Sequence, residues 1–373
     1  MKFDISYLAH IAHLQSGYEE ALEASGYDAV VLHSGLALRQ RGVDDQYWPL
    51  KADPSFSQWL PLQEHGTFLV IHKGARPKLI RSARDSFWEG PAPRSGDHFE
   101  SSFDSVKSAP EAVSKELPAG KLAWIGDATS IAQSIGIDDQ DINASQLVAR
   151  LDALRVLKTD YEMQCLALAS QNAAKGHAHL ARLFAEGQYS ELDLHLEYLR
   201  VTQQDASDTP YSNIVAQGRN AAILHHVFYT REQDGSDDLS LLVDAGANSM
   251  GYASDITRTY VRGQSQAARD FAALIAGMER LQLALCDEVK PGLAYEDLHN
   301  RSHEMLAELL LESNLCTGGA TTLVEQGVTR AFFPHGLGHS LGLQVHDVGC
   351  RLSPPAQQNP FLRNTSTITE RQV

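Results

Sequence analysis

Three histidines with the spacing of a metal site occur between residues 332 and 348. His335, His339 and His346 are set there among three glycines. Glycine lets the backbone and a ligand approach each other closely, because it has no Cβ atom. Such a segment suits a metal site better than a hydrophobic core.

Two aspartates lie upstream, on what the pattern predicts to be neighbouring strands. The apolar run 241–243 ends in Asp244, and a turn containing Gly and Asn returns the chain along a second strand that carries Asp255. Carboxylates in one pocket repel each other unless a proton or a cation lies between them, so a metal pair is the simplest resolution. The alternative is that Asp255 pairs only with Arg258. His339 favours a metal, because oxygen ligands plus an imidazole suit Mn²⁺, Fe²⁺, Co²⁺ or Zn²⁺ better than Ca²⁺.

These motifs make the chain resemble the pita-bread metallopeptidases along nearly its whole length. The C-terminal motifs are the strands of Asp244 and Asp255 and the segments 334–339 and 346–348. The likeness is strongest to the bacterial Xaa-Pro dipeptidases, or prolidases, including the organophosphorus acid anhydrolases. A creatinase-type N-terminal domain is indicated by segments 33–35, 39–40, 44–49 and 59–62. The resemblance implies an α/β (α+β) fold, with a creatinase-like N-terminal domain and a pita-bread C-terminal catalytic domain.

The resemblance also implies a pair of divalent metal ions. Asp244 would bind one metal, Asp255 would bridge both, and His339 would bind the second. In the family, a hydroxide held between the metals attacks the scissile carbonyl of a dipeptide that ends in proline. Manganese is the expected metal, with cobalt, zinc or iron as alternatives. Organophosphate triesters are an expected side substrate.

Three histidines are implied to be catalytic, namely His346, His335 and His225. His346 would stabilise the tetrahedral intermediate or hold the carboxylate of the dipeptide. His226 is an alternative to the adjacent His225, and either can be an ordinary strand imidazole. The resemblance therefore leaves the choice between these two neighbours open.

Four further residues are implied to bind the substrate: Tyr211, Tyr295, Asp45 and Leu224. Tyr295 can alternatively be a packing residue at the start of a helix. Asp45 resembles an acid of the N-terminal domain that reaches the pocket of a neighbouring subunit. This likeness implies a homodimer in which each N-terminal domain completes the opposite site.

The sequence departs from the family at two metal ligands. The family takes two glutamates from later strands, the first in a Thr-Ile-Glu-Pro-Gly type motif, and neither is found here. After His339 the only acidic side chains are Asp347 and Glu370, and Glu370 is followed by Arg371. The chain is then either a C-terminally incomplete prolidase or an inactive pita-bread protein with a role in binding or assembly.

Charge and composition exclude several classes of partner. The 31 Lys and Arg against 47 Asp and Glu give a formal net charge of −16, which disfavours nucleic acid and anionic membranes. Four cysteines without Cys-x-x-Cys spacing are expected to be reduced thiols. The start lacks a signal-type apolar core, and no apolar run is long enough to span a membrane. We therefore expect a cytoplasmic protein.

The length of 373 residues predicts two domains. Strand-like runs at 28–33, 67–72 and 121–126 predict a small α/β domain. A helix at 144–157, with Asn143 as its N-cap, is followed by an N-cap signal at Thr159 and a helix at 161–184. We place the boundary at Lys158, which gives domains 1–158 and 159–373. Long amphipathic patterns predict further helices in the second domain, at 190–202, 267–289 and 295–313.

Overall fold

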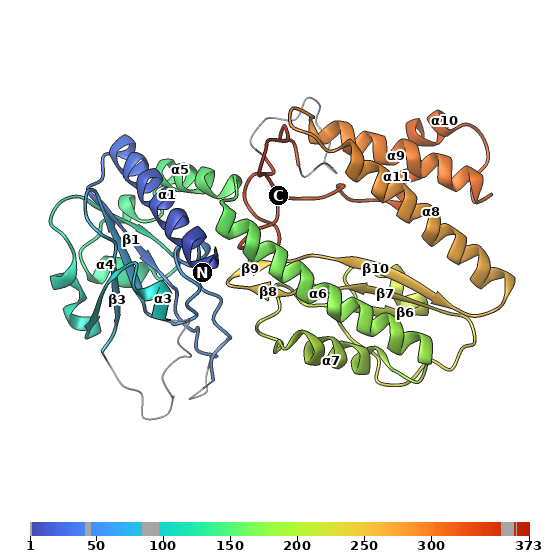
Figure 1. The fold of residues 1–373 in the computed structure, drawn as a ribbon, viewed down its shortest axis with the longest axis horizontal. Coiled ribbons are helices and arrows are strands. Elements are labelled where there is room, and N and C mark those ends of the chain that lie inside the picture. Colours follow the sequence, from blue (N-terminus) through green and yellow to red (C-terminus); the bar gives the residue numbers. More distant parts are fainter. Residues whose placement is uncertain (1, 42–45, 84–96, 352–361, 363) are drawn as a thin grey trace. The chain divides into compact units, whose positions relative to one another are not determined.

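The chain folds into two compact units, Met1–Gln164 and Cys165–Val373. The computed structural model describes residues 2–41, 46–83, 97–351, 362 and 364–373. Each unit combines helices with a β-sheet (Figure 1). This mixed composition agrees with the predicted α/β class.

A five-stranded sheet in the order β4-β3-β2-β1-β5 forms the centre of the first unit. β1 pairs antiparallel with β2 and parallel with β5. Every residue of β1 is buried, as expected of a strand that is covered on both faces. The strands are β1 (Ala29–His33), β2 (Phe68–His72), β3 (Lys78–Ser82), β4 (Asp104–Ser108) and β5 (Leu122–Ile125).

Two long helices of the first unit contact each other, α1 (Lys2–Ser25) and α5 (Ser145–Val156). The predicted N-cap of α5 is wrong, because the cap position is Ala144. Asn143 instead has a left-handed backbone with φ of 50°, and its Oδ1 atom accepts a hydrogen bond of 3.0 Å from the N–H of Gly126. The shorter helices are α2 (Pro54–Ser57), α3 (Asp97–Glu100), η1 (Pro110–Glu116), α4 (Thr129–Ser134) and η2 (Asp139–Asp141).

The second unit contains an antiparallel sheet in the order β10-β7-β6. Its strands are β6 (Ile214–Gln217), β7 (Leu239–Asp244) and β10 (Thr257–Arg262). Two short strands, β8 (Asn248–Ser249) and β9 (Tyr252–Ala253), pair within the connection from β7 to β10. β7 is the central strand, and its alternate residues 239, 241 and 243 are buried. This alternation places one face of β7 in the core.

Helices α6 (Asp160–Glu186) and α7 (Glu191–Thr202) lie beside the sheet of β6 and β7 (Figure 1). Apolar side chains of both helices pack against these two strands. Ser190 begins α7 with a capping box that includes Asp193. Helices α8 (Gln266–Glu288) and α9 (Tyr295–Glu312) contact each other, and η3 (Gly218–Ala222), α10 (Ala320–Glu325) and α11 (Val328–Phe332) complete the unit. The three helices predicted for this part of the chain are confirmed to within one residue at each end.

Candidate metal centre

Asp244 and Asp255 flank the β7–β10 connection. Asp244 is the last residue of β7, whereas Asp255 lies two residues before β10 begins, so its predicted place on the second strand is wrong. Asp244 ends β7, where Thr257 of β10 is its antiparallel partner. Because residues 239, 241 and 243 of β7 face the core, Asp244 faces the opposite side of the sheet. The N–H of Ala245 donates a hydrogen bond of 3.0 Å to the carbonyl of Ile256, so the residues that follow the two aspartates are joined.

The hydroxyl of Tyr211 lies between the two carboxylates. Its oxygen is 2.6 Å from Oδ1 of Asp244 and 2.9 Å from Oδ1 of Asp255. A phenol has one proton and can donate it to only one of these oxygens. Burial raises the pKa of Asp244, and the nearby charge of Asp255 raises it further. The one neutral hydroxyl therefore satisfies only one of the two carboxylate oxygens that face it.

Gly246 allows this close arrangement. A Cβ atom at this position would collide with the carbonyl oxygen of Ser254 and lie 3.0 Å from Cε1 of Tyr211. Ser254 is fully buried, and its N–H donates to the carbonyl of Ala247 at 2.9 Å. The hydroxyl oxygen of Ser254 accepts a hydrogen bond from the N–H of Ala247, also at 2.9 Å. The two arms of the connection are thus held together directly beside the aspartates.

His339 reaches Asp255 from the glycine-rich segment. Its Nε2 atom is 3.1 Å from Oδ2 of Asp255. The segment is held against β9 by a hydrogen bond of 2.8 Å from the N–H of Ala253 to the carbonyl of Gly342. Burial alone would lower the pKa of His339 and raise that of Asp255. Several interactions together outweigh burial and move each pKa in the opposite direction: Asp255 and the carbonyl of Ser340 raise the pKa of His339, and His339 and Tyr211 lower the pKa of Asp255.

His346 and Tyr295 lie next to this segment. The ring centroids of His346 and His339 are 4.1 Å apart. The hydroxyl of Tyr295 packs so closely on Gly338 that a Cβ atom there would collide with it. Tyr295 is also the first residue of α9, and burial raises its pKa. Both residues adjoin a predicted metal ligand, and their roles toward a substrate stay predictions.

Among the described residues, no hydrogen bond, ion pair or ring contact joins His335, Leu224 or His225 to Asp244, Asp255 or His339. The ring of His335 packs edge-on against Phe333, with centroids 4.8 Å apart, and its Nδ1 atom lies 2.9 Å from the carbonyl oxygen of Gly336. Leu224 and His225 are exposed in the segment that follows η3. Asp45 lies outside the described residues, so the structure does not bear on its proposed role.

The structure distinguishes His225 from His226. His226 is buried, and its Nε2 atom lies 2.8 Å from Oε2 of Glu191. Glu191 is itself fully buried. It also accepts hydrogen bonds from the backbone N–H groups of Gln217 and Thr230 and from the side-chain amide of Asn220. His226 therefore has a structural partner, whereas the side chain of His225 is exposed and its catalytic role stays a prediction.

Sequence reasoning missed Thr257, whose side chain hydrogen bonds to Asp244. The signal was present, because a residue two positions after Asp255 on a strand points to the same face. The alternative in which Asp255 pairs only with Arg258 is wrong. The guanidinium of Arg258 donates to the carbonyl of Thr257 at 2.7 Å, while Asp255 contacts His339.

The donor set of this cluster fits a divalent cation. Asp244, Asp255 and His339 supply carboxylate oxygens and an imidazole nitrogen, the ligand types preferred by manganese, iron, cobalt and zinc. A cation would also balance the two carboxylates that now share one hydroxyl proton. Among the described residues, no three His, Cys, Asp or Glu side chains converge closely enough to form a complete metal site. The roles of Asp244, Asp255 and His339 as metal ligands therefore stay predictions.

Comparison with known proteins identifies the family. Metallopeptidase family M24 matches residues 164–373, and the N-terminal domain of Xaa-Pro dipeptidase matches residues 5–152. The chain belongs to metallopeptidase family M24. The Xaa-Pro dipeptidase of Pseudoalteromonas atlantica is 38% identical to this M24 chain over 381 residues, which cover 98% of the chain and 84% of that protein. The Xaa-Pro dipeptidase of Shewanella oneidensis is 37% identical over 378 residues, with the same coverage.

Solved structures show the same fold as this M24 chain. Aminopeptidase P from E. coli in its low-pH form has a TM-score of 0.75 at 22% identity, covering 97% of this chain and 85% of that chain. Proline aminopeptidase P II from Yersinia pestis has a TM-score of 0.71 at 20% identity, covering 96% and 86%. The expected creatinase-like N-terminal domain and pita-bread domain are confirmed. The boundary at Lys158 falls between the two matched ranges and stays a prediction.

None of the described helices combines the length and the apolar character that crossing a membrane requires. The four cysteines of this M24 chain, Cys165, Cys286, Cys316 and Cys350, are free thiols. This outcome agrees with the expectation of reduced cysteines.

Proposed function

We propose that this protein is an Xaa-Pro dipeptidase that uses two divalent metal ions. The names of relatives at 37–38% identity support this substrate class. The observation that carries the proposal is the cluster around Tyr211. There, the hydroxyl of Tyr211 lies within hydrogen-bond distance of both Asp244 and Asp255, and His339 from a distant segment contacts Asp255.

Asp244, Asp255 and His339 are the residues that would hold the metals. Asp255 is suited to be the shared ligand, because its two oxygens face different partners. Its Oδ1 atom faces the hydroxyl of Tyr211, which also contacts Asp244, whereas its Oδ2 atom faces His339. Bound divalent cations would supply Lewis acidity and a water of lowered pKa. We propose manganese, with cobalt, zinc or iron as alternatives, because all four accept oxygen and imidazole ligands.

The chain's own side chains would orient the dipeptide. His346, beside His339, is placed to hydrogen bond either to the dipeptide carboxylate or to the carbonyl oxygen as it becomes negative. The exposed His225 and Leu224 are proposed to contact the substrate from the segment after η3. His335 is proposed as a further cleft residue. The aromatic rings of Tyr211 and Tyr295 would complete the substrate cleft.

Other parts of the assignment follow from the same family likeness. We propose a homodimer in which Asp45 of one subunit completes the site of the other. Organophosphate triesters are a proposed side substrate, because a phosphoryl oxygen needs the same stabilisation of developing negative charge as a peptide carbonyl. Four free thiols support a reducing, cytoplasmic location.

A second candidate function is a non-catalytic role in binding or assembly. It is favoured by the size of the donor set, since three protein ligands leave many coordination positions of a metal pair to water. Each coordination position that water fills in place of an anionic ligand also leaves the positive charge of the metals less compensated. Under this alternative, metal binding would be weak and dipeptide hydrolysis would be absent.

The test is a measurement of metal binding and hydrolysis on the same preparation. The purified protein is stripped with a chelator, titrated with Mn²⁺ by calorimetry, and then assayed for release of proline from Ala-Pro. Ala-Ala serves as the control substrate, and Asp255→Asn as the control variant. We expect Mn²⁺-dependent release of proline that Asp255→Asn abolishes. Absence of both Mn²⁺ binding and proline release would refute the enzyme assignment and favour the second candidate.

A further inference from the structure

Helix α6 contacts both arms of the connection that carries the two aspartates. The hydroxyl oxygen of Ser254, the residue before Asp255, lies 3.2 Å from the carbonyl oxygen of Ala169 on α6 and 3.2 Å from that of Ala247, and its single proton can be donated to either. Two turns further along the helix, Nε2 of His177 lies 3.0 Å from the carbonyl oxygen of Ala245, the residue after Asp244. One rigid helix therefore contacts the chain directly beside each carboxylate.

The contact made by His177 extends across both arms. The carbonyl of Ala245 accepts from His177, and the N–H of the same residue donates to the carbonyl of Ile256 at 3.0 Å. Ile256 directly follows Asp255. The hydrogen bonds thus run from α6 through the residue after Asp244 to the residue after Asp255. A shift of His177 would be transmitted to the spacing of the two carboxylates.

The chemistry of His177 indicates a dedicated hydrogen-bond donor. A carbonyl oxygen only accepts, so the proton of the imidazole must be on Nε2. Burial lowers the pKa of His177, against the effect of the carbonyls of Ala245 and Ile256, so the ring is neutral at neutral pH. Within the described residues its Nδ1 atom has no hydrogen-bond partner. An apolar side chain would fill this space without leaving a buried nitrogen unpaired, so packing alone does not account for a histidine here.

The ring of His177 is also fixed in place by its neighbours. The side chain is 4% exposed, and the ring of Tyr198 on α7 packs edge-on against it, with centroids 5.8 Å apart. Tyr198 can approach this part of α6 because the preceding residue is Gly176, where a Cβ atom would lie 2.6 Å from Cδ2 of Tyr198. The donor is therefore held rigidly with respect to the carbonyl of Ala245.

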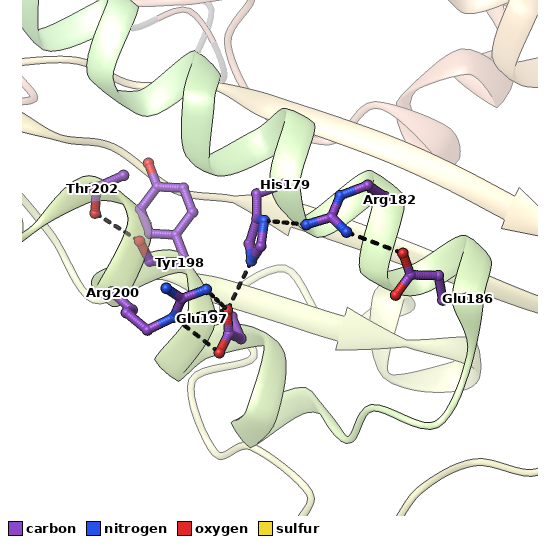
Figure 2. A network of polar contacts seen from close by, with 7 residues as sticks. All are labelled: His179, Arg182, Glu186, Glu197, Tyr198, Arg200 and Thr202. Carbon is purple, nitrogen blue, oxygen red and sulfur yellow. Dashed lines mark hydrogen bonds and ion pairs between the residues drawn. The ribbon is translucent and has the colours of Figure 1, made fainter.

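His179, two residues further along α6, has a different environment. Its Nε2 atom lies 2.8 Å from Oε2 of Glu197 on α7, and its Nδ1 atom lies 3.0 Å from Nη2 of Arg182 (Figure 2). Glu197 is bound in turn by Arg200. This network joins α6 to α7 and includes no residue of the β7–β10 connection. His179 is therefore a control residue of the same type on the same helix.

We propose that His177 is a positioning residue of the metal centre, which fixes the spacing of Asp244 and Asp255 through the carbonyl of Ala245. The assignment of a metal to these carboxylates rests on the proposed function. The claim that His177 fixes the spacing of the two aspartates concerns the metal-free protein alone. The two parts are therefore tested by separate measurements.

The experiment compares four variants: His177→Leu, His177→Asn, His177→Gln and His179→Leu. The amide of Gln can reach the place of Nε2, whereas the shorter amide of Asn reaches only the place of Nδ1. Hydrogen exchange by mass spectrometry on the metal-free proteins reports on the backbone of residues 244–256. Calorimetric titration with Mn²⁺ reports on the site itself.

We expect the backbone amides of residues 244–256 to exchange at least about tenfold faster in His177→Leu and His177→Asn than in the wild type. Both variants should also bind Mn²⁺ about tenfold more weakly, which is the lower end of the range for losing a residue that supports a metal ligand. His177→Gln should restore most of the slow amide exchange and most of the Mn²⁺ affinity. His179→Leu should match the wild type in amide exchange and in Mn²⁺ affinity. Unchanged exchange in His177→Leu would overturn the proposal. If that variant does not fold, equal exchange rates in His177→Asn and His177→Gln would overturn it. If the wild type binds no Mn²⁺, the proposed function fails, and the exchange data still decide the geometric claim.

Discussion

Nε2 of His339 lies 3.1 Å from Oδ2 of Asp255, although the two residues belong to widely separated segments. His335, in the same glycine-rich segment, packs on Phe333 instead. We predict that His339→Asn weakens Mn²⁺ binding by more than about tenfold, because the pocket loses its proposed nitrogen ligand. His335→Asn should bind Mn²⁺ as the wild type does. Calorimetric titration of the two variants checks this, and equal weakening in both would show that the segment acts as a whole.

Replacement of Gly246 should disturb the whole cluster. We predict that Gly246→Ala lowers the free energy of unfolding by about 1–3 kcal/mol, the range for a side chain forced into a filled space. The added Cβ atom would displace the carbonyl of Ser254 or the ring of Tyr211. Gly235→Ala is the matched control, because no atom lies within 4 Å of a Cβ atom built there. Urea unfolding measures the stability of Gly246→Ala and of Gly235→Ala. Equal stabilities of these two variants would refute the steric explanation.

The part of the site that follows from local pattern could be predicted from the sequence. An apolar run ending in Asp244, a turn and a strand carrying Asp255 predict that two carboxylates meet, and the structure places both beside Tyr211. The glycine-rich segment predicts close approach, which occurs where Gly338 contacts Tyr295. Periodicity and turn chemistry are local properties, so a single sequence contains them.

The supporting contacts could not be predicted in the same way. His177 and Glu191 bind backbone groups that come close only after α6 and α7 pack on the sheet. Every residue has a backbone carbonyl, and nearly every residue has an N–H group. A sequence motif therefore does not indicate which of these groups a side chain will bind. The error at Asn143 has a related cause. Asn tolerates a left-handed backbone, and its side chain found a distant partner in Gly126 instead of the end of α5.

Tyr211 should stabilise the metal-free protein through its contact with the two carboxylates. We predict that Tyr211→Phe lowers the free energy of unfolding of the metal-free protein by about 1.5–3 kcal/mol, the range for a hydrogen bond to a charged group. Saturating Mn²⁺ should then stabilise the variant more than the wild type, because a cation replaces the lost proton donor between Asp244 and Asp255. Urea unfolding with and without Mn²⁺ checks both statements. A loss of stability that Mn²⁺ does not reduce would assign the effect of Tyr211 to packing.

Glu191 should make a contribution to stability that depends on pH. Burial alone would raise the pKa of Glu191, but four hydrogen bonds, including that of His226, lower it below its ordinary value. A carboxyl group whose pKa is lower in the folded state stabilises the fold above its unfolded pKa of about 4.3, and the contribution is lost as the pH falls through the folded pKa. We predict that Glu191→Gln lowers the free energy of unfolding by about 1–3 kcal/mol at neutral pH.

The difference between Glu191→Gln and the wild type should shrink as the pH falls below about 4.3, because protonation removes the charge from the wild-type side chain as well. Urea unfolding over a series of pH values measures this difference in the free energy of unfolding. Glu186→Gln is the control, since Glu186 is exposed on α6 and makes an ion pair only of the i,i+4 type with Arg182 in the described structure. Such a pair contributes little, so this variant should unfold as the wild type does at every pH. A difference for Glu191→Gln that stays constant with pH would show that the shape of the side chain, and not its charge, holds the segment of His226 in place.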